Sequence, residues 1–173
     1  YDDGALGLTQ SATKMNELLA LAADKGDAEA RYNLGISYRY GEGGLAIDFN
    51  RCVELLEQSA TQGLVEAMML TGHSYYSGTG VEQNDEFAFK WHMKAANKGD
   101  GLAQGILGEF YEDGRGVEID LVKAMYWYQK SAAQGNQDAI DAVERLCISA
   151  AATRAAAWQS EAAEESRKFS DRS

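Results

Sequence analysis

A set of glycine and tyrosine positions recurs three times along this chain. Successive copies are 36 residues apart, with one extra residue in the first copy, between Gly43 and Asp48. The clearest copy, residues 107–135, reads LGEFYEDGRGVEIDLVKAMYWYQKSAAQG. The recurring positions are Gly35, Gly72 and Gly108; Tyr38, Tyr75 and Tyr111; Gly41/Gly43, Gly78/Gly80 and Gly114/Gly116; and Gly63, Gly99 and Gly135. A fixed period of this length is typical of a stacked array of repeats.

Each copy predicts two helices joined by a glycine turn. In the first copy, one helix is expected from about Ala28 to Tyr40 and a second after Asp48. The side chains of Asp48, Asn84 and Asp120 can cap the second helices by accepting a bond from a free amide. The Gly-x-Gly pairs suit a turn with positive φ, which costs little only for glycine. The complete repeats are predicted at residues 27–63, 64–99 and 100–135.

Small and large residues also recur in phase, which predicts how the helices pack. Gly35, Gly72 and Gly108 stand where two helices of a hairpin must approach closely. The large residues are expected to fill the space between neighbouring hairpins, because one hairpin cannot bury its apolar face alone. They are Leu55, Trp91 and Trp127, and Leu56, His92 and Tyr128.

Composition supports an all-α protein and excludes several classes of partner. None of the 173 residues is proline, which would interrupt helices, and 45% of residues are hydrophobic. No apolar run approaches the roughly 18 residues that a membrane-spanning helix needs. The net charge of −11 repels phosphate backbones and anionic lipid, so nucleic acid and membrane insertion are disfavoured and a basic partner is favoured.

The ends of the array depart from the pattern. Residues 1–26 read as the back half of a repeat, with Ser11 as the cap of its helix, so we expect further repeats before Tyr1. Residues 136–148 read as a front half. Residues 149–173 are alanine-rich and predict a capping helix, either continuous with the preceding one or separate, with a frayed tail from Ser170. An apolar seam in this region could instead serve self-association: Ile148, Ala151, Ala155, Trp158 and Ala162.

The repeat resembles the Sel-one-like repeat (SLR) family, a branch of the tetratricopeptide-like solenoids. The residues that carry the resemblance are Ala30, Leu34-Gly35, Tyr38, Gly41-x-Gly43, Asp48, Ala60 and Gly63, with their two successors. The resemblance implies a right-handed α-α superhelix whose first helices line a concave surface. It also implies an adaptor or scaffold role. The cysteine-rich branch staples each hairpin with a disulfide, whereas Cys52 and Cys147 are expected here as buried free thiols.

If the first helices face the groove as in this family, their outward phase gives the candidate partner-binding residues. These are Glu29, Tyr32, Ile36 and Arg39 in the first repeat; Glu66, Met69, His73 and Tyr76 in the second; and Leu102, Gly105, Glu109 and Glu112 in the third. Tyr32 and Ile36 occupy the places of the Lys/Asn clamp by which some tetratricopeptide domains hold a carboxylate, so a C-terminal carboxylate ligand is disfavoured. Aromatic and Met residues in such a surface are common interface anchors.

No catalytic, metal or cofactor site is predicted. The glycine turns lack the Gly-Lys-Ser/Thr ending of a phosphate loop, and the acids around residues 109–120 do not fit a calcium loop. His92 occupies a packing position, and His73 faces the groove.

The sequence therefore predicts a non-enzymatic adaptor that binds a protein or peptide in its groove. The alternatives are an immunity-type protein that neutralises a secreted toxin and, from another class, a cell-wall hydrolase. The expected setting is the bacterial cytoplasm or periplasm.

Overall fold

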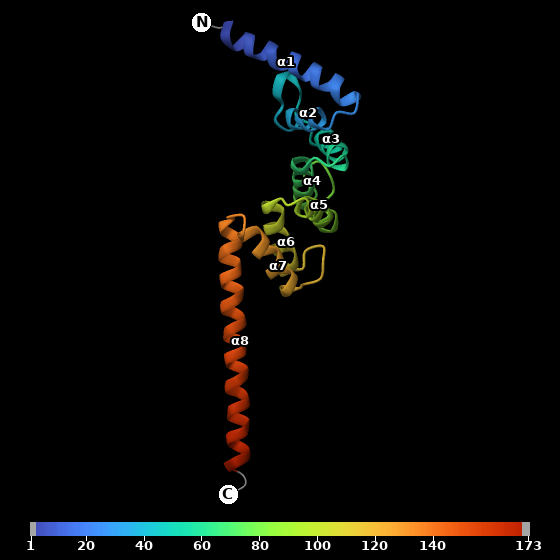
Figure 1. Ribbon diagram of the computed structural model, residues 1–173. Coiled ribbons are helices and arrows are strands. Elements are labelled where there is room, and N and C mark those ends of the chain that lie inside the picture. Colours follow the sequence, from blue (N-terminus) through green and yellow to red (C-terminus); the bar gives the residue numbers. More distant parts are fainter. Residues whose placement is uncertain (1–2, 171–173) are drawn as a thin grey trace.

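The computed structural model describes residues 3–170, with side chains described for 11–161, and shows helices stacked in chain order (Figure 1). The elements are α1 (Asp3–Asp24), α2 (Ala28–Tyr40), the 3-10 turn η1 (Glu42–Gly44), α3 (Phe49–Thr61), α4 (Val65–Ser77), α5 (Asp85–Asn97), α6 (Gly101–Asp113), α7 (Leu121–Ala132) and α8 (Gln137–Ser170). No strand occurs among the described residues. The predicted all-α solenoid of helical hairpins is confirmed.

The predicted caps of the second helices are confirmed in every complete repeat. The Oδ1 atoms of Asp48 and Asn84 accept bonds from the amides three residues on, at 2.9 and 3.0 Å. Asp120 accepts from two amides, those of Val122 and Lys123. These bonds satisfy amides that the first turn of a helix leaves free, so each second helix begins where the sequence predicts.

The second glycine of each Gly-x-Gly turn is needed for contact as well as for its backbone angle. Gly116 has φ of 62°, and a Cβ there would overlap the backbone of Asp85, at the start of α5. Gly80 has the same relation to Phe49, at the start of α3. Each turn is therefore pressed against the preceding hairpin, which fixes the angle between repeats.

The close contact predicted inside the hairpins is confirmed in the second and third repeats and is looser at Gly35 in the first. A Cβ on Gly108 would overlap the ring of Tyr128, and a Cβ on Gly72 would lie 2.8 Å from Nε2 of His92. His92 and Tyr128, which were predicted to lie between hairpins, therefore pack inside their own hairpins. All the large residues of this prediction are buried, with exposed fractions between 0% and 8%: Leu55, Trp91 and Trp127, and Leu56, His92 and Tyr128. Most of the core is one continuous cluster that runs from Cys52 to Ala142.

The N-terminal helix differs from the half repeat expected there. Ser11 caps nothing, since α1 begins at Asp3 and Ser11 lies exposed within it. The later part of α1 does act as a second helix, because Asn16 donates to the carbonyl of Glu42 at 2.8 Å and Ala23 is buried against α2. No breaker stops the helix before Ser11, since the glycine spacing there is Gly4 to Gly7 and not Gly-x-Gly. Tyr1 lies outside the described residues.

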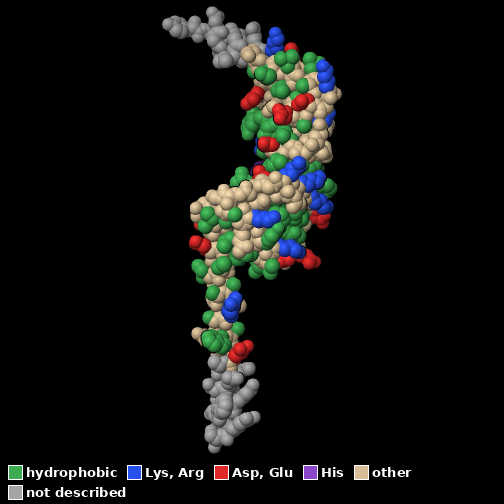
Figure 2. Space-filling model, viewed as in Figure 1, with side chains coloured by type: hydrophobic (Ala, Val, Ile, Leu, Met, Phe, Trp, Pro, Cys, Tyr) green, Lys and Arg blue, Asp and Glu red, His purple; other side chains and the backbone are tan. Residues whose placement is uncertain are grey.

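The C-terminal helix covers the last hairpin with its first turns only. Ala139 and Ala142 are buried against α6 and α7, whereas every side chain from Cys147 to Glu161 is exposed. Figure 1 shows α8 continuing away from the repeats. In Figure 2 the coloured part of α8 beyond the repeats forms a narrow projection. The cap is therefore made by 137–146, and not by the alanine-rich segment from residue 149.

The two cysteines and the C-terminal tail were also predicted from the sequence. Cys52 is buried and Cys147 is exposed, and both are free thiols, so burial of the second thiol was a wrong prediction. The tyrosines at the equivalent position are held by a following second helix, but α8 runs straight on. Of the proposed frayed tail, Ser170 closes α8 and 171–173 lie outside the described residues.

The glycine contact generates a stability prediction. Gly108→Ala should lower the free energy of unfolding by about 1–3 kcal/mol, because the added methyl group overlaps a ring fixed in the core. Gly35→Ala is the matched control, since the nearest atom to its Cβ is the carbonyl oxygen of Cys52, at 3.3 Å. There the gain in helix propensity should keep the change within about 1 kcal/mol. Urea unfolding measures both, and equal losses would contradict this account.

His92 generates a pH prediction. Burial lowers its pKa to about 4, with the charge of His73 acting in the same direction and Asp100 opposing. In the unfolded chain His92 takes up a proton near pH 6.5, whereas in the native state it stays neutral down to about pH 4. The free energy of unfolding therefore decreases as the pH falls below about 6.5. Between pH 7 and 5 the loss should be about 2 kcal/mol. His92→Phe should remove this part of the slope in urea titrations at both pH values, and slopes equal to those of the parent would refute it.

The exposed part of α8 generates a third prediction. Deleting 150–173 should leave the melting temperature within about 2 °C of the parent, because every described side chain that it removes is exposed. Deleting 137–173 is the control, since it removes Ala139 and Ala142 and so uncovers the side of α6 and α7 on which they pack. Thermal denaturation followed by circular dichroism measures both. A large loss in the shorter deletion would show that the alanine-rich segment supports the array.

Candidate functional site

Two adjoining pockets lie along the first helices of successive repeats. The larger, about 620 Å³, lies between α6 and α8, and the smaller, about 290 Å³, lies between α4 and α6. Met69, Ile106 and Glu109 line both pockets, so the two form one groove. The regular stacking of hairpins produces this surface, because each first helix turns the same phase toward it.

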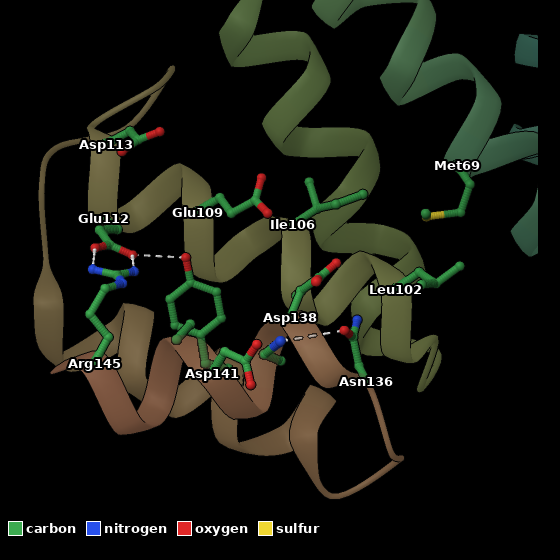
Figure 3. A pocket seen from close by; sticks show the side chains of 14 residues that line it. Met69, Leu102, Ile106, Glu109, Glu112, Asp113, Asn136, Asp138, Asp141 and Arg145 are labelled. Atoms are coloured by element: carbon green, nitrogen blue, oxygen red, sulfur yellow. Dashed lines mark hydrogen bonds and ion pairs between the residues drawn. The ribbon is translucent and has the colours of Figure 1, made fainter. Parts of the chain in front are cut away.

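One end of the larger pocket is closed by a charged junction that joins three helices (Figure 3). Arg145 of α8 makes two parallel bonds to the carboxylate of Glu112 on α6, at 2.6 and 2.8 Å. The hydroxyl of Tyr128 on α7 donates to the same carboxylate at 2.9 Å. Bidentate pairs of this kind are directional as well as strong, so the junction fixes the start of α8 against the last hairpin.

The protonation states of this junction are set by its contacts. The hydrogen bonds from Arg145, helped by the one from Tyr128 and opposed by burial, hold the pKa of Glu112 below its usual range. Burial, followed by the bond to Glu112, raises the pKa of Tyr128. At neutral pH the carboxylate is therefore ionised and the phenol is a donor, which gives a structural strut and not a proton-transfer pair.

Three of the acids that line the larger pocket make no ion pair in the described part of the chain. Five carboxylates line it against one guanidinium. Glu112 pairs with Arg145, and Asp113 pairs with Arg115 at 2.9 Å. Glu109, Asp138 and Asp141 make no ion pair within the described part of the chain. Burial raises the pKa of Glu109. The charge of Arg115 opposes this shift, and the charges of Asp113, Asp138 and Glu112 add to it.

The smaller pocket is mainly apolar. Its floor and walls come from Met69, Leu70, Ile106 and Phe110, with His92 below. Arg115 lies at the rim over the ring of Tyr76, hydrogen-bonded to its hydroxyl and paired with Asp113.

His92 adds little charge to this pocket. It is 3% exposed, its Nδ1 has no hydrogen-bond partner in the described structure, and burial keeps the ring neutral at pH 7. The packing role predicted for His92 agrees with its burial.

Several of the residues predicted for the groove come together here. Met69, His73 and Tyr76 line the smaller pocket, and Leu102, Gly105, Glu109 and Glu112 line the larger. The others, Glu29, Tyr32, Ile36, Arg39 and Glu66, lie on α2 and at the start of α4, outside these two pockets. Tyr32 packs partly against the core.

The sequence reading missed the part of the groove that α8 contributes. Asp138, Asp141 and Arg145 all line the larger pocket. They stand 36 residues after Leu102, Gly105 and Glu109, which is one repeat length. The repeat position that predicted those three groove residues therefore also predicts Asp138, Asp141 and Arg145. The signal was overlooked because the glycine and tyrosine markers end at Gly135.

The described residues form neither a metal site nor a membrane-spanning helix. No three His, Cys, Asp or Glu side chains among them lie close enough together to hold a metal ion. Within the same part of the chain, no helix combines the length and hydrophobicity that crossing a membrane requires.

Comparison with known proteins agrees with the geometry. The chain is 32% identical to the protective antigen c5321 of uropathogenic Escherichia coli, which displays an SLR fold, with a TM-score of 0.72 over 74% of this chain and 27% of that one. It is 37% identical to a Sel1 repeat protein from Oxalobacter formigenes, with a TM-score of 0.68 over 73% of this chain and 95% of that one.

Among curated proteins, the chain is 34% identical to the chitin synthase regulator SKT5 of Saccharomyces cerevisiae over 101 residues. These are 58% of this chain and 14% of the regulator, so the chain spans only a small part of that relative's length. The Sel1 repeat model matches residues 28–64, 65–100 and 101–136. The chain belongs to the Sel1 repeat family.

Proposed function

We propose that this protein is a non-enzymatic adaptor that binds a segment of a partner protein in the groove formed by α4, α6 and α8. The observation that carries the proposal is the continuity of the two pockets, which share Met69, Ile106 and Glu109 across successive repeats. Membership of a family whose members typically mediate protein interaction supports it. The yeast relative is itself named a regulator.

The groove has the character of a protein-binding surface. Leu102 is 65% exposed at its edge, and Met69 and Ile106 supply a partly buried apolar floor. Interface energy usually concentrates in a few apolar or aromatic anchors surrounded by polar contacts. An apolar floor with a charged rim matches that arrangement. The predicted continuation on α2, through Glu29, Tyr32, Ile36 and Arg39 and then Glu66 on α4, would lengthen the same surface.

The polar groups of the groove favour binding over catalysis. Glu112 and Tyr128 are committed to a strut, and His92 is buried and neutral. Glu109 has no basic partner in the described residues that could share a proton with it as an acid–base pair. We therefore propose no cofactor and no reaction.

The proposal is tested with peptides selected from a random 12-residue display library on the intact chain. Leu102→Arg should weaken the selected peptides at least tenfold, about 1.4 kcal/mol, because it replaces an apolar contact with a cation in the groove. Ile148→Arg is the matched control, because Ile148 is 70% exposed on α8 outside both pockets. Fluorescence anisotropy measures the affinities. Equal effects of the two substitutions would move the binding site off the groove.

A further inference from the structure

We infer that the bound segment pairs a bulky apolar side chain with a neighbouring lysine or arginine. The apolar side chain would enter the smaller pocket, and the cationic one would meet the carboxylates of the larger pocket at Glu109. This inference rests on the proposed function, because it specifies what the groove binds. It is carried by the shape of the two pockets and by the charges left unpaired between them.

The smaller pocket suits a single large apolar side chain. Its volume of about 290 Å³ lies at the lower limit of the roughly 300–1,000 Å³ typical of small-molecule sites. Met69, Leu70, Ile106 and Phe110 offer carbon and sulfur surface to an occupant. An aromatic or long aliphatic residue gains most from such a site, because buried apolar area dominates anchor energy.

The rim of the smaller pocket does not repel a nearby cation strongly. Its one guanidinium, that of Arg115, is already paired with Asp113 and bonded to Tyr76. The imidazole of His92 is neutral at pH 7, because burial lowers its pKa to about 4. The charge that an incoming segment meets is therefore set by the acids of the neighbouring pocket.

The larger pocket offers three carboxylates that have no basic partner among the described residues. Glu109 projects from α6, and Asp138 and Asp141 project from the first turns of α8 (Figure 3). An opposite charge within about 4–6 Å stabilises an ionised carboxylate. A lysine or arginine placed between the two helices would therefore be attracted by these carboxylates, whereas an acidic segment would be repelled.

Glu109 links the two requirements. It lines both pockets, and its side chain is exposed and so accessible to an incoming cation. A residue anchored in the smaller pocket therefore has its chain neighbours beside Glu109. Since an extended chain advances about 3.3 Å per residue, the cationic residue should lie within about three positions of the apolar one.

The test uses a random 12-residue peptide display library selected on the full chain, without an assumed partner. The enriched peptides should carry Lys or Arg within about three positions of Phe, Trp, Leu or Met. Glu109→Lys should weaken the best peptide at least tenfold, and Glu109→Gln, which keeps the shape, about threefold. Raising the salt from about 50 to 500 mM should also weaken binding.

Glu118→Lys is the matched control, since it makes the same charge reversal on an exposed turn residue outside both pockets. Thermal melts of each variant confirm folding. Enriched peptides without basic residues, or equal effects at Glu109 and Glu118, would overturn the inference. If Leu102→Arg weakens binding while both Glu109 variants do not, only this inference fails. If none of them weakens binding, the groove is not the site and the proposed function fails as well.

Discussion

The structure depends on one repeated contact, in which a glycine on the first helix of a hairpin packs against a large side chain from the second helix. Gly108 receives the ring of Tyr128, and Gly72 receives His92. This contact brings the two helices of a hairpin close together and buries the large residue. The opposite side of each first helix stays uncovered, and these uncovered sides form the groove.

The second constraint is the pressing of each glycine turn against the start of the preceding second helix. Gly116 against Asp85 and Gly80 against Phe49 leave no room for a side chain. These contacts hold each repeat directly against the preceding one. As a result, equivalent positions on α4, α6 and α8 face the same space, which allows residues such as Met69 and Glu109 to share a pocket.

The charge of the groove follows from how its acids are paired. Arg145 is used to hold α8 on the last hairpin, and Arg115 is used beside its own turn. Both guanidiniums are thus committed to the scaffold. The carboxylates that remain belong to the same surface, so part of the net charge of −11 is concentrated, without ion pairs in the described structure, along the groove.

The sequence by itself determined the helices, their caps and their turns, because these depend on local chemistry that recurs with a fixed period. Asp48, Asn84 and Asp120 cap as expected, and Gly72 and Gly108 lie at the tight contacts. The same phase also identified Met69, Leu102 and Glu109 as groove positions, and it would have given Asp138 and Arg145 had it been carried one copy further.

Only the tertiary structure decided how the helices outside the three complete repeats begin, end and bury their side chains. Ser11 caps nothing and Cys147 is exposed, because no glycine turn ends α1 before Ser11 or α8 after Leu146. It also decided which acids are paired, since Arg145 reaches Glu112 across 33 residues of sequence while Glu109 stays unpaired in the described structure. Local propensity acts within a few residues, whereas burial and ion pairing depend on which side chains the stacked hairpins bring together.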